Sequence, residues 1–99
     1  MSGCCPYYHE AIELIGKRWT GAIVVVLLDT GPMRFSEIGA AVPALSDRLL
    51  SERMRELEAR GLVTRTELEV GVEYALTEMG RDLDAAVTEL RAWARRWLS

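Results

Sequence analysis

The sequence has few of the features on which disulfide-rich and membrane-spanning proteins depend. Its two cysteines, Cys4 and Cys5, are neighbours in the chain, and adjacent cysteines rarely meet the geometry of a relaxed disulfide. Its longest apolar run, Ala22 to Leu28, is far shorter than the ~18 residues that a membrane helix needs, and no signal peptide precedes it. We therefore expect a cytoplasmic protein without a disulfide framework or a membrane segment.

The sequence also lacks an identifiable catalytic or metal site. His9 is the only histidine, no glycine-rich phosphate loop is present, and no nucleophile stands at motif spacing from a base. Cys4, Cys5 and His9 form a loose cluster of metal ligands, but no second pair at standard spacing accompanies them. We expect neither an enzyme nor a bound cofactor or metal.

An excess of basic residues, which marks many nucleic-acid-binding proteins, is missing as well. The 99 residues carry 12 lysines and arginines against 15 acidic residues, a net charge of −3, which alone argues weakly against nucleic acid. The charges are segregated, however, because residues 67–90 hold seven acidic residues and one basic residue, whereas residues 17–36 and 46–66 are net positive. The length and the 49% hydrophobic content suit one domain, residues 1–99.

Three short helical patterns occupy the first half of the chain. Helices are expected over residues 9–15, 20–29 and 36–42, with Thr20 and Ser36 as N-caps. The β-branched residues of the second segment would also suit a strand, but its bounds, a threonine and a Gly-Pro pair, favour a helix.

The strongest helical pattern begins at Ser46. Leu50, Met54 and Leu57 recur at helical spacing, and Gly61 supplies a left-handed stop. The opposite face of this helix is polar and mixed in charge.

A hairpin and a long final helix follow. Residues 62–68 and 72–76 alternate apolar and polar side chains around a turn at 69–71, which is typical of two antiparallel strands. A last helix is expected from Thr77 to the C-terminus. Apolar residues recur along it at alternating intervals of four and three residues. This apolar stripe consists of Leu83, Val87, Leu90, Ala94 and Trp97.

The final helix favours a homodimer. A small core cannot cover the whole stripe, and exposed Trp93 and Trp97 would leave an apolar patch on a monomer. The expected dimer contacts are Leu83, Val87, Leu90, Trp93, Ala94 and Trp97. In the alternative interpretation, Leu83 and Val87 pack within their own chain and only the tip with the tryptophans reaches a partner.

The order of elements, four helices, a hairpin and a helix, is that of a winged helix-turn-helix. We thus expect a mainly α fold with a small β-hairpin (α+β), dimerising through its terminal helices. The helix that begins at Ser46 presents short polar side chains and arginines at its N-terminal end, where a helix in the major groove meets the base edges.

Four segments resemble the HxlR-type transcriptional regulators, a branch of the winged-helix proteins close to the MarR group. They are Cys5-Pro6, ELIGKRWTGAIVVVLLDTGPMRFSEI, LSDRLLSERMRELEARGLVTR and VEYALTEMGRDL. The resemblance implies a homodimeric regulator that binds double-stranded DNA, usually a repressor of nearby genes, with residues 46–60 as its recognition helix. In several such relatives an N-terminal cysteine senses oxidants or electrophiles, and that cysteine matches Cys5.

The resemblance also implies which side chains contact DNA. The residues expected to face bases are Ser46, Asp47, Arg48 and Ser51, with Arg55 reaching base or phosphate. The residues expected near the sugar-phosphate backbone of the DNA are Lys17, Arg18, Arg34, Ser36 and Arg65. Arg48 is the strongest candidate, because a guanidinium can bond guanine O6 and N7 together, which contributes ~1–3 kcal/mol of discrimination. The alternative for each arginine is a solvated surface charge, and we expect this for Arg53 and Arg60.

The hairpin tip departs from the family pattern. The family commonly has a longer tip with prolines and a basic residue, whereas residues 68–71 are short and lie between Glu67 and Glu73, with Arg65 as the only cation. The third helix also lacks the basic residues often found there. Phosphates repel an acidic tip, so we expect weak, strongly salt-dependent binding to an inverted-repeat operator.

Three alternatives stay open. The fold could serve a protein partner through its acidic hairpin rather than DNA. Two chains could form bridges between Cys5 and Cys5 or Cys4, or these thiols could be inert. A small-molecule effector could bind between the dimer-forming helices, in a pocket lined by Tyr7, Tyr8, Trp19 and the C-terminal tryptophans.

Overall fold

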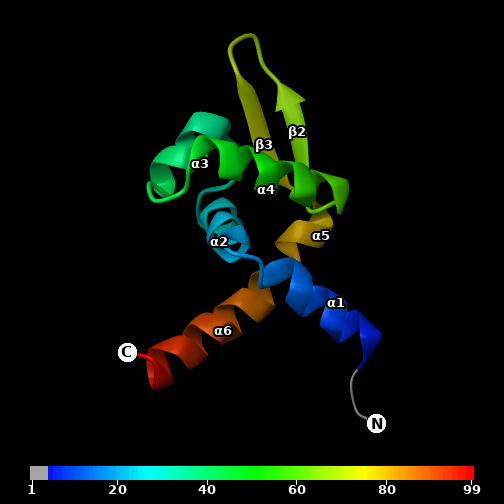
Figure 1. The fold of residues 1–99 in the computed structure, drawn as a ribbon, viewed down its shortest axis with the longest axis vertical. Helices are drawn as coiled ribbons and strands as arrows, with labels where there is room; N and C mark the ends of the chain where they lie inside the picture. The colour runs from blue at the N-terminus through cyan, green and yellow to red at the C-terminus, as the bar shows by residue number, and fades with distance from the viewer. Residues whose placement is uncertain (1–4) are drawn as a thin grey trace.

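The computed structural model describes residues 5–99, so Cys4 lies outside the described residues. The chain forms a mainly helical fold with a small antiparallel sheet, as expected (Figure 1). The elements in chain order are α1 (Pro6–Ile15), α2 (Thr20–Thr30), β1 (Met33–Arg34), α3 (Phe35–Ala41), α4 (Asp47–Ala59), β2 (Val63–Glu67), β3 (Val72–Leu76), α5 (Glu78–Arg81) and α6 (Asp84–Trp97). Within residues 5–99, no helix combines the length and apolar character that crossing a bilayer requires.

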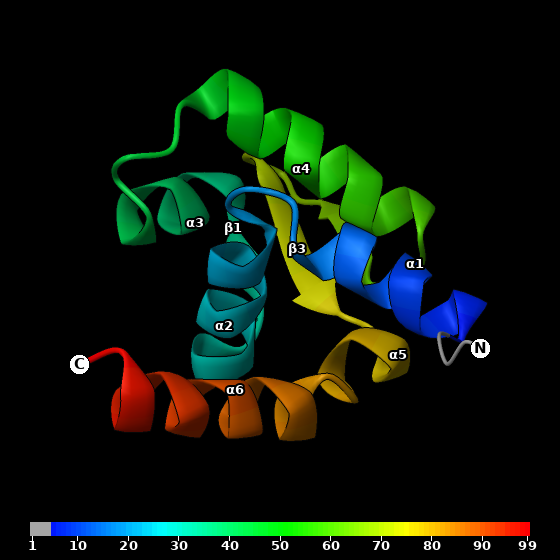
Figure 2. The same ribbon diagram turned by 60° about the horizontal axis from the view of Figure 1, so that its bottom comes forward.

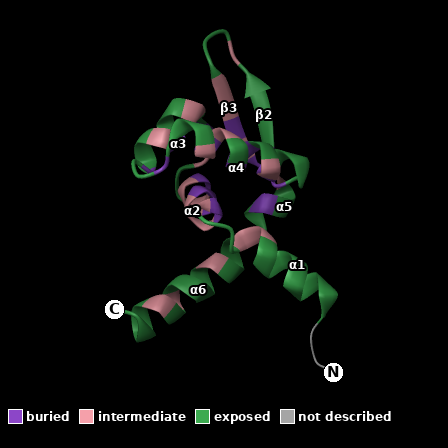
Figure 3. Ribbon diagram, in the orientation of Figure 1, coloured by how far each residue is buried: buried purple, intermediate pink, exposed green. Residues whose placement is uncertain are grey.

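The core lies between α2, α3, α4 and the sheet. The apolar stripe of α4, Leu50, Met54 and Leu57, is at most 1% exposed and packs with Ile23 and Ile38, which are fully buried (Figure 3). Because this stripe faces inward, the opposite face of α4 is left in solvent.

The predicted hairpin is present, but the sheet has a third strand that the sequence did not predict. β2 and β3 pair in antiparallel register from Val63 opposite Leu76 to Glu67 opposite Val72. The two-residue β1 pairs with the other edge of β3, giving the order β1-β3-β2. A strand this short has no detectable alternation, and only its tertiary partner defines it.

Two predicted N-caps are wrong. Thr20 is the buried first residue of α2, and Trp19, in a left-handed conformation with φ 76°, precedes it as the N-cap. Ser36 lies inside the first turn of α3, whose N-cap is Arg34, and the Glu37 carboxylate accepts the Arg34 backbone N–H at 2.7 Å. The glutamate therefore satisfies the helix start, and no serine cap is needed. α1 also begins earlier than expected, at Pro6, a residue favoured in the first helical position.

The expected single final helix is broken into α5 and α6. Thr77 Oγ1 accepts the backbone N–H of Gly80 at 3.1 Å and donates to the carbonyl of Gly61 at 2.6 Å, which ties α5 to the base of the hairpin. A Cβ atom at Gly80 would lie 2.3 Å from the Leu62 carbonyl oxygen, so only glycine allows this close approach. Beyond α5 the chain turns, and α6 runs past the end of α2, on the side of the molecule opposite α4 (Figure 2).

Candidate nucleic-acid interface

The outer face of α4 carries the residues expected to meet DNA bases. Ser46 caps the helix as predicted, since its Oγ accepts the Leu49 backbone N–H at 3.2 Å. Asp47, Arg48 and Arg55 are exposed, and Ser51 is half-buried. The Arg55 guanidinium donates to Ser51 Oγ at 3.1 Å, which holds the arginine along the helix surface. The structure therefore places Asp47, Arg48, Ser51 and Arg55 along one side of α4, with Ser46 as the N-cap at its start.

A groove of about 620 Å³ separates this face from the β2–β3 hairpin, which we call the wing. Ser51, Arg55 and Glu58 contribute from α4, and Arg65 from the wing. Arg65 donates to the Glu67 carboxylate at 3.3 Å, and this contact, followed by one with Tyr74, raises the pKa of the Arg65 guanidinium. The groove thus holds two cations, one of them partly neutralised by a neighbouring acid.

Arg34 lies at the junction of α3 and the wing. Its Nη1 donates to the backbone carbonyl of Val70, at the tip of the wing, at 3.3 Å. Ser36 is exposed two residues further along the chain. The structure places the Arg34 guanidinium beside the tip of the wing.

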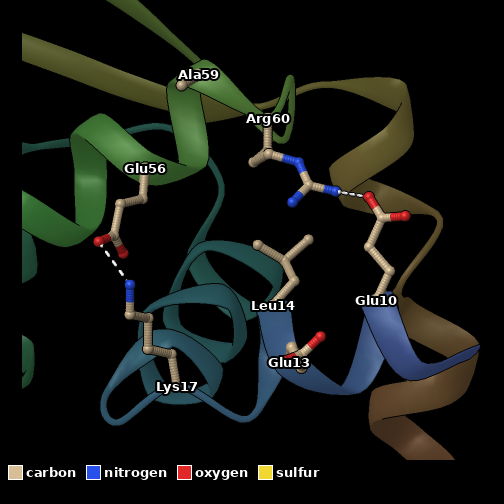
Figure 4. Close-up of a pocket in the computed structure, with 7 residues that line it drawn as sticks. All are labelled: Glu10, Glu13, Leu14, Lys17, Glu56, Ala59 and Arg60. Atoms are coloured by element: carbon tan, nitrogen blue, oxygen red, sulfur yellow. Dashed lines mark hydrogen bonds and ion pairs between the residues drawn. The ribbon is translucent and has the colours of Figure 1, made fainter. Parts of the chain in front are cut away.

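Lys17 and Arg18 are less available than the sequence suggested. The Lys17 ammonium lies 2.9 Å from the Glu56 carboxylate, and this hydrogen bond is the main reason that the pKa of Glu56 is lowered (Figure 4). The Arg18 guanidinium stacks over the Trp19 ring, 5.0 Å from its centre. A phosphate contact by Lys17 would have to compete with Glu56.

The sequence interpretation missed the structural role of Arg53. Predicted as a solvated charge, it is 8% exposed. Its Nε donates to the Arg18 carbonyl at 2.9 Å, and its Nη1 lies 3.4 Å from Glu56. Its position three residues after Leu50, next to Met54 on the buried stripe, is the signal that could have revealed it.

Arg60 is a surface charge, as expected. It pairs with Glu10 of α1, and with Lys17 and Glu56 it lines a hollow of about 560 Å³ between α1 and α4 (Figure 4). Two ion pairs and the Arg53 hydrogen bond therefore join the N-terminal helix and its following turn to the C-terminal half of α4.

Cys5 is an exposed free thiol at the N-cap of α1. Pro6 follows it as the first helical residue. The thiol is thus open to a reagent or to a second chain.

Of the residues expected to line an effector pocket between two chains, Tyr7 lines a hollow within one chain. Tyr7 lines a hollow of about 290 Å³ with Leu14, Leu62, Met79 and Leu83, among others. Tyr8, Trp19 and the C-terminal tryptophans do not line it. A pocket shared by these aromatic side chains between two chains therefore stays a prediction.

The expected dimer stripe on α6 divides into two faces. Leu83 and Val87 are half-buried against the core of their own chain, as the alternative interpretation held. Arg91, on the same side, pairs with Asp29 of α2 at 3.4 Å. Ala94 is half-buried.

Next to this side of α6 lies the α6 apolar patch, formed by Leu90, Trp93 and Trp97, which are 63%, 50% and 67% exposed. A second exposed pair, the α1 apolar patch, consists of Tyr8 and Ile12, which lie four residues apart on one side of α1, and Tyr7 is exposed as well. Both patches lie on the two helices that extend from the body (Figure 1).

These features together define a class of protein. α3 and α4 form a helix-turn-helix whose second helix presents an exposed polar face, and a β-hairpin stands beside it. This is the arrangement of a winged helix-turn-helix, which places its second helix in the DNA major groove.

The chain belongs to the HxlR-like helix-turn-helix family, which matches residues 14–99. It is 45% identical to the uncharacterized HTH-type transcriptional regulator YvaP of Bacillus subtilis (strain 168), over 99% of this chain and 93% of that protein. The crystal structure of quinone-bound YodB from B. subtilis superimposes with a TM-score of 0.86 at 45% identity, covering 95% of this chain and 100% of that one. The redox regulator HypR in its reduced form superimposes with a TM-score of 0.82 at 35% identity, covering 90% of each chain.

The family assigns the chain to the transcriptional regulators and not to the enzymes. Its relatives include a regulator solved with a bound quinone and one described as a redox regulator.

Proposed function

We propose that residues 1–99 form one winged helix-turn-helix domain that acts as a homodimeric, sequence-specific repressor. The main support for this proposal is the outer face of α4. Arg48 is exposed there at the N-terminal end of the helix, and within residues 5–99 it takes part in no ion pair. A fully charged guanidinium in this position is ready for guanine O6 and N7 in a major groove.

The DNA backbone would pass along the groove between α4 and the wing. Arg55 on one wall and Arg65 on the other supply donors for phosphate oxygens, whereas Glu58 repels them. Because so few unpaired cations face this side, affinity should depend strongly on salt.

The two apolar patches support a dimer. The α6 and α1 apolar patches lie on helices that extend from the body, and a second chain of the same kind could cover both. A twofold dimer of helix-turn-helix units binds two half-sites, and we therefore infer an inverted-repeat operator.

Selection from a random double-stranded DNA pool tests this function. An enriched inverted repeat with reduced protein would support the dimeric regulator, and a second selection after mild oxidation would show whether the thiols control binding. No enrichment at low salt would favour a protein-binding role instead. That role has one feature in its support, the exposed acids Glu67 and Glu69 on the wing.

Replacing Arg48 with alanine should lower the preference for the selected site by about 5- to 150-fold, the equivalent of ~1–3 kcal/mol for one bidentate base contact. The fold should stay intact because the side chain is exposed. Titrations of the selected and of scrambled DNA measure the ratio, with Arg95→Ala on α6 as a control of equal charge loss. An unchanged ratio would remove Arg48 from the base-reading set.

We also propose that Cys5 responds to oxidants or electrophiles. Its exposed position at the start of α1 supports this, as do the relatives solved with quinone and in reduced and oxidised forms. Treatment with diamide should yield a cross-linked dimer on a non-reducing gel, and Cys5→Ser should abolish it. If the Cys5→Ser protein cross-links equally, Cys4 is the reactive thiol.

A further inference from the structure

Arg34 is held through both its backbone and its side chain. Its N–H donates to Glu37 Oε1, which fixes it at the start of α3, and its Cα pairs with that of Glu73 in the β1–β3 ladder. Its guanidinium donates to the Val70 carbonyl at 3.3 Å. One residue thus joins the beginning of the helix-turn-helix to the tip of the wing.

The wing tip has little else to hold it. The strand register ends at Glu67 opposite Val72, and beyond this pair the turn has one backbone hydrogen bond of its own, from Leu68 N–H to the Gly71 carbonyl at 3.0 Å. Val70 is 76% exposed. Within residues 5–99, the Arg34 guanidinium makes the one hydrogen bond that reaches this turn from outside the hairpin.

The wing and α4 must meet the same duplex. α4 is fixed by the core, and so is the body of the hairpin through Tyr74, whereas the position of the tip depends on the contacts of the turn and on Arg34. A tip that moves freely must be ordered when DNA binds, and this ordering weakens affinity. A tip that is already held avoids this loss.

We propose that Arg34 is a positioning residue that fixes the wing tip relative to α4, so that both elements reach DNA together. This inference rests on the proposed DNA-binding function and goes beyond it, since Arg34 acts through the Val70 carbonyl and not as a phosphate contact. It also explains how an acidic wing with a partly neutralised Arg65 contributes to binding.

Amide hydrogen exchange on the DNA-free protein tests the contact. In Arg34→Ala the Leu68 amide should exchange about fivefold faster, which corresponds to the loss of one hydrogen bond of ~1 kcal/mol. Arg34→Lys, which keeps a donor and the charge, should restore most of the protection. Arg95→Ala on α6 should leave the amide unchanged. Equal exchange in wild type and Arg34→Ala would overturn the proposal.

DNA titrations over a range of salt concentrations test the consequence. Arg34→Ala should weaken binding to the selected operator about tenfold while the slope of log K against log salt stays constant. If the slope becomes less steep by ~0.9 and the Leu68 amide exchanges as in the wild type, Arg34 is a phosphate contact instead. Faster exchange with unchanged affinity would show that the wing position does not matter. If the wild type binds no DNA, the proposed function is wrong. Arg34 can then still hold the wing tip, but this has no effect on DNA binding.

Discussion

Arg53→Ala is expected to lower the free energy of unfolding by about 2–3 kcal/mol. The substitution removes a buried donor from the Arg18 carbonyl and a partner from Glu56, and it leaves a space on the inner face of α4. The value lies below that of a fully buried ion pair because the Glu56 side chain is 32% exposed and solvent screens the pair. Thermal unfolding should show a decrease in Tm of roughly 10–20 °C.

Two variants separate the polar contact from packing. Arg53→Met keeps most of the side-chain volume. Its free energy of unfolding should fall by about half as much as that of Arg53→Ala, because the Arg18 carbonyl stays without its donor. Arg48→Ala, on the exposed face of the same helix, should change stability by about 0.5 kcal/mol or less. All variants are compared at one protein concentration, since the proposed dimerisation would make Tm depend on it. If Arg53→Met is as stable as the wild type, the hydrogen bond does not hold the α1–α2 turn.

The sequence predicted α4 well because its pattern is redundant. Leu50, Met54 and Leu57 set the buried face, and the Ser46 cap and Gly61, at φ 81°, set the ends, so several independent local signals agreed. Once the buried face of α4 was predicted, helical geometry alone identified the exposed face. Most of the candidate DNA-binding surface could therefore be predicted from the local pattern of the helix.

The parts that were missed depend on contacts between distant residues. β1 has two residues and exists only because Met33 pairs with Tyr74. The break between α5 and α6 follows from Gly80 packing against the Leu62 backbone, which no periodicity shows. Tertiary contacts override local propensity in such places.

The charged residues show the same limit. Lys17 finds its partner Glu56 39 residues away, and Arg34 reaches Val70 across 36 residues. Helical spacing predicts only pairs three or four apart, such as Arg53 with Glu56. The sequence therefore identified the cations near the candidate site but could not show which of them were already engaged.

The α6 apolar patch leads to the largest expected effect on DNA binding. Replacing Trp93 and Trp97 with glutamine should convert the dimer to a monomer, because both side chains are at least half exposed and a second chain is proposed to cover them. The fold should survive, since Leu83 and Val87, which pack against the core, are untouched. Sedimentation should show a single species near the 11.1 kDa chain mass.

Loss of the dimer should weaken binding to a two-half-site operator by about 10²–10⁴-fold, because the second half-site then no longer benefits from a high effective concentration. The matched control is Thr88→Gln with Arg95→Gln, two exposed positions on the opposite side of α6 by helical spacing. This control should remain dimeric and keep its affinity for the operator apart from a small effect of the lost charge. A dimeric Trp93→Gln, Trp97→Gln protein would move the interface to the α1 apolar patch. A monomer that binds the operator as tightly as the wild type would contradict the proposal that dimerisation creates the DNA-binding unit.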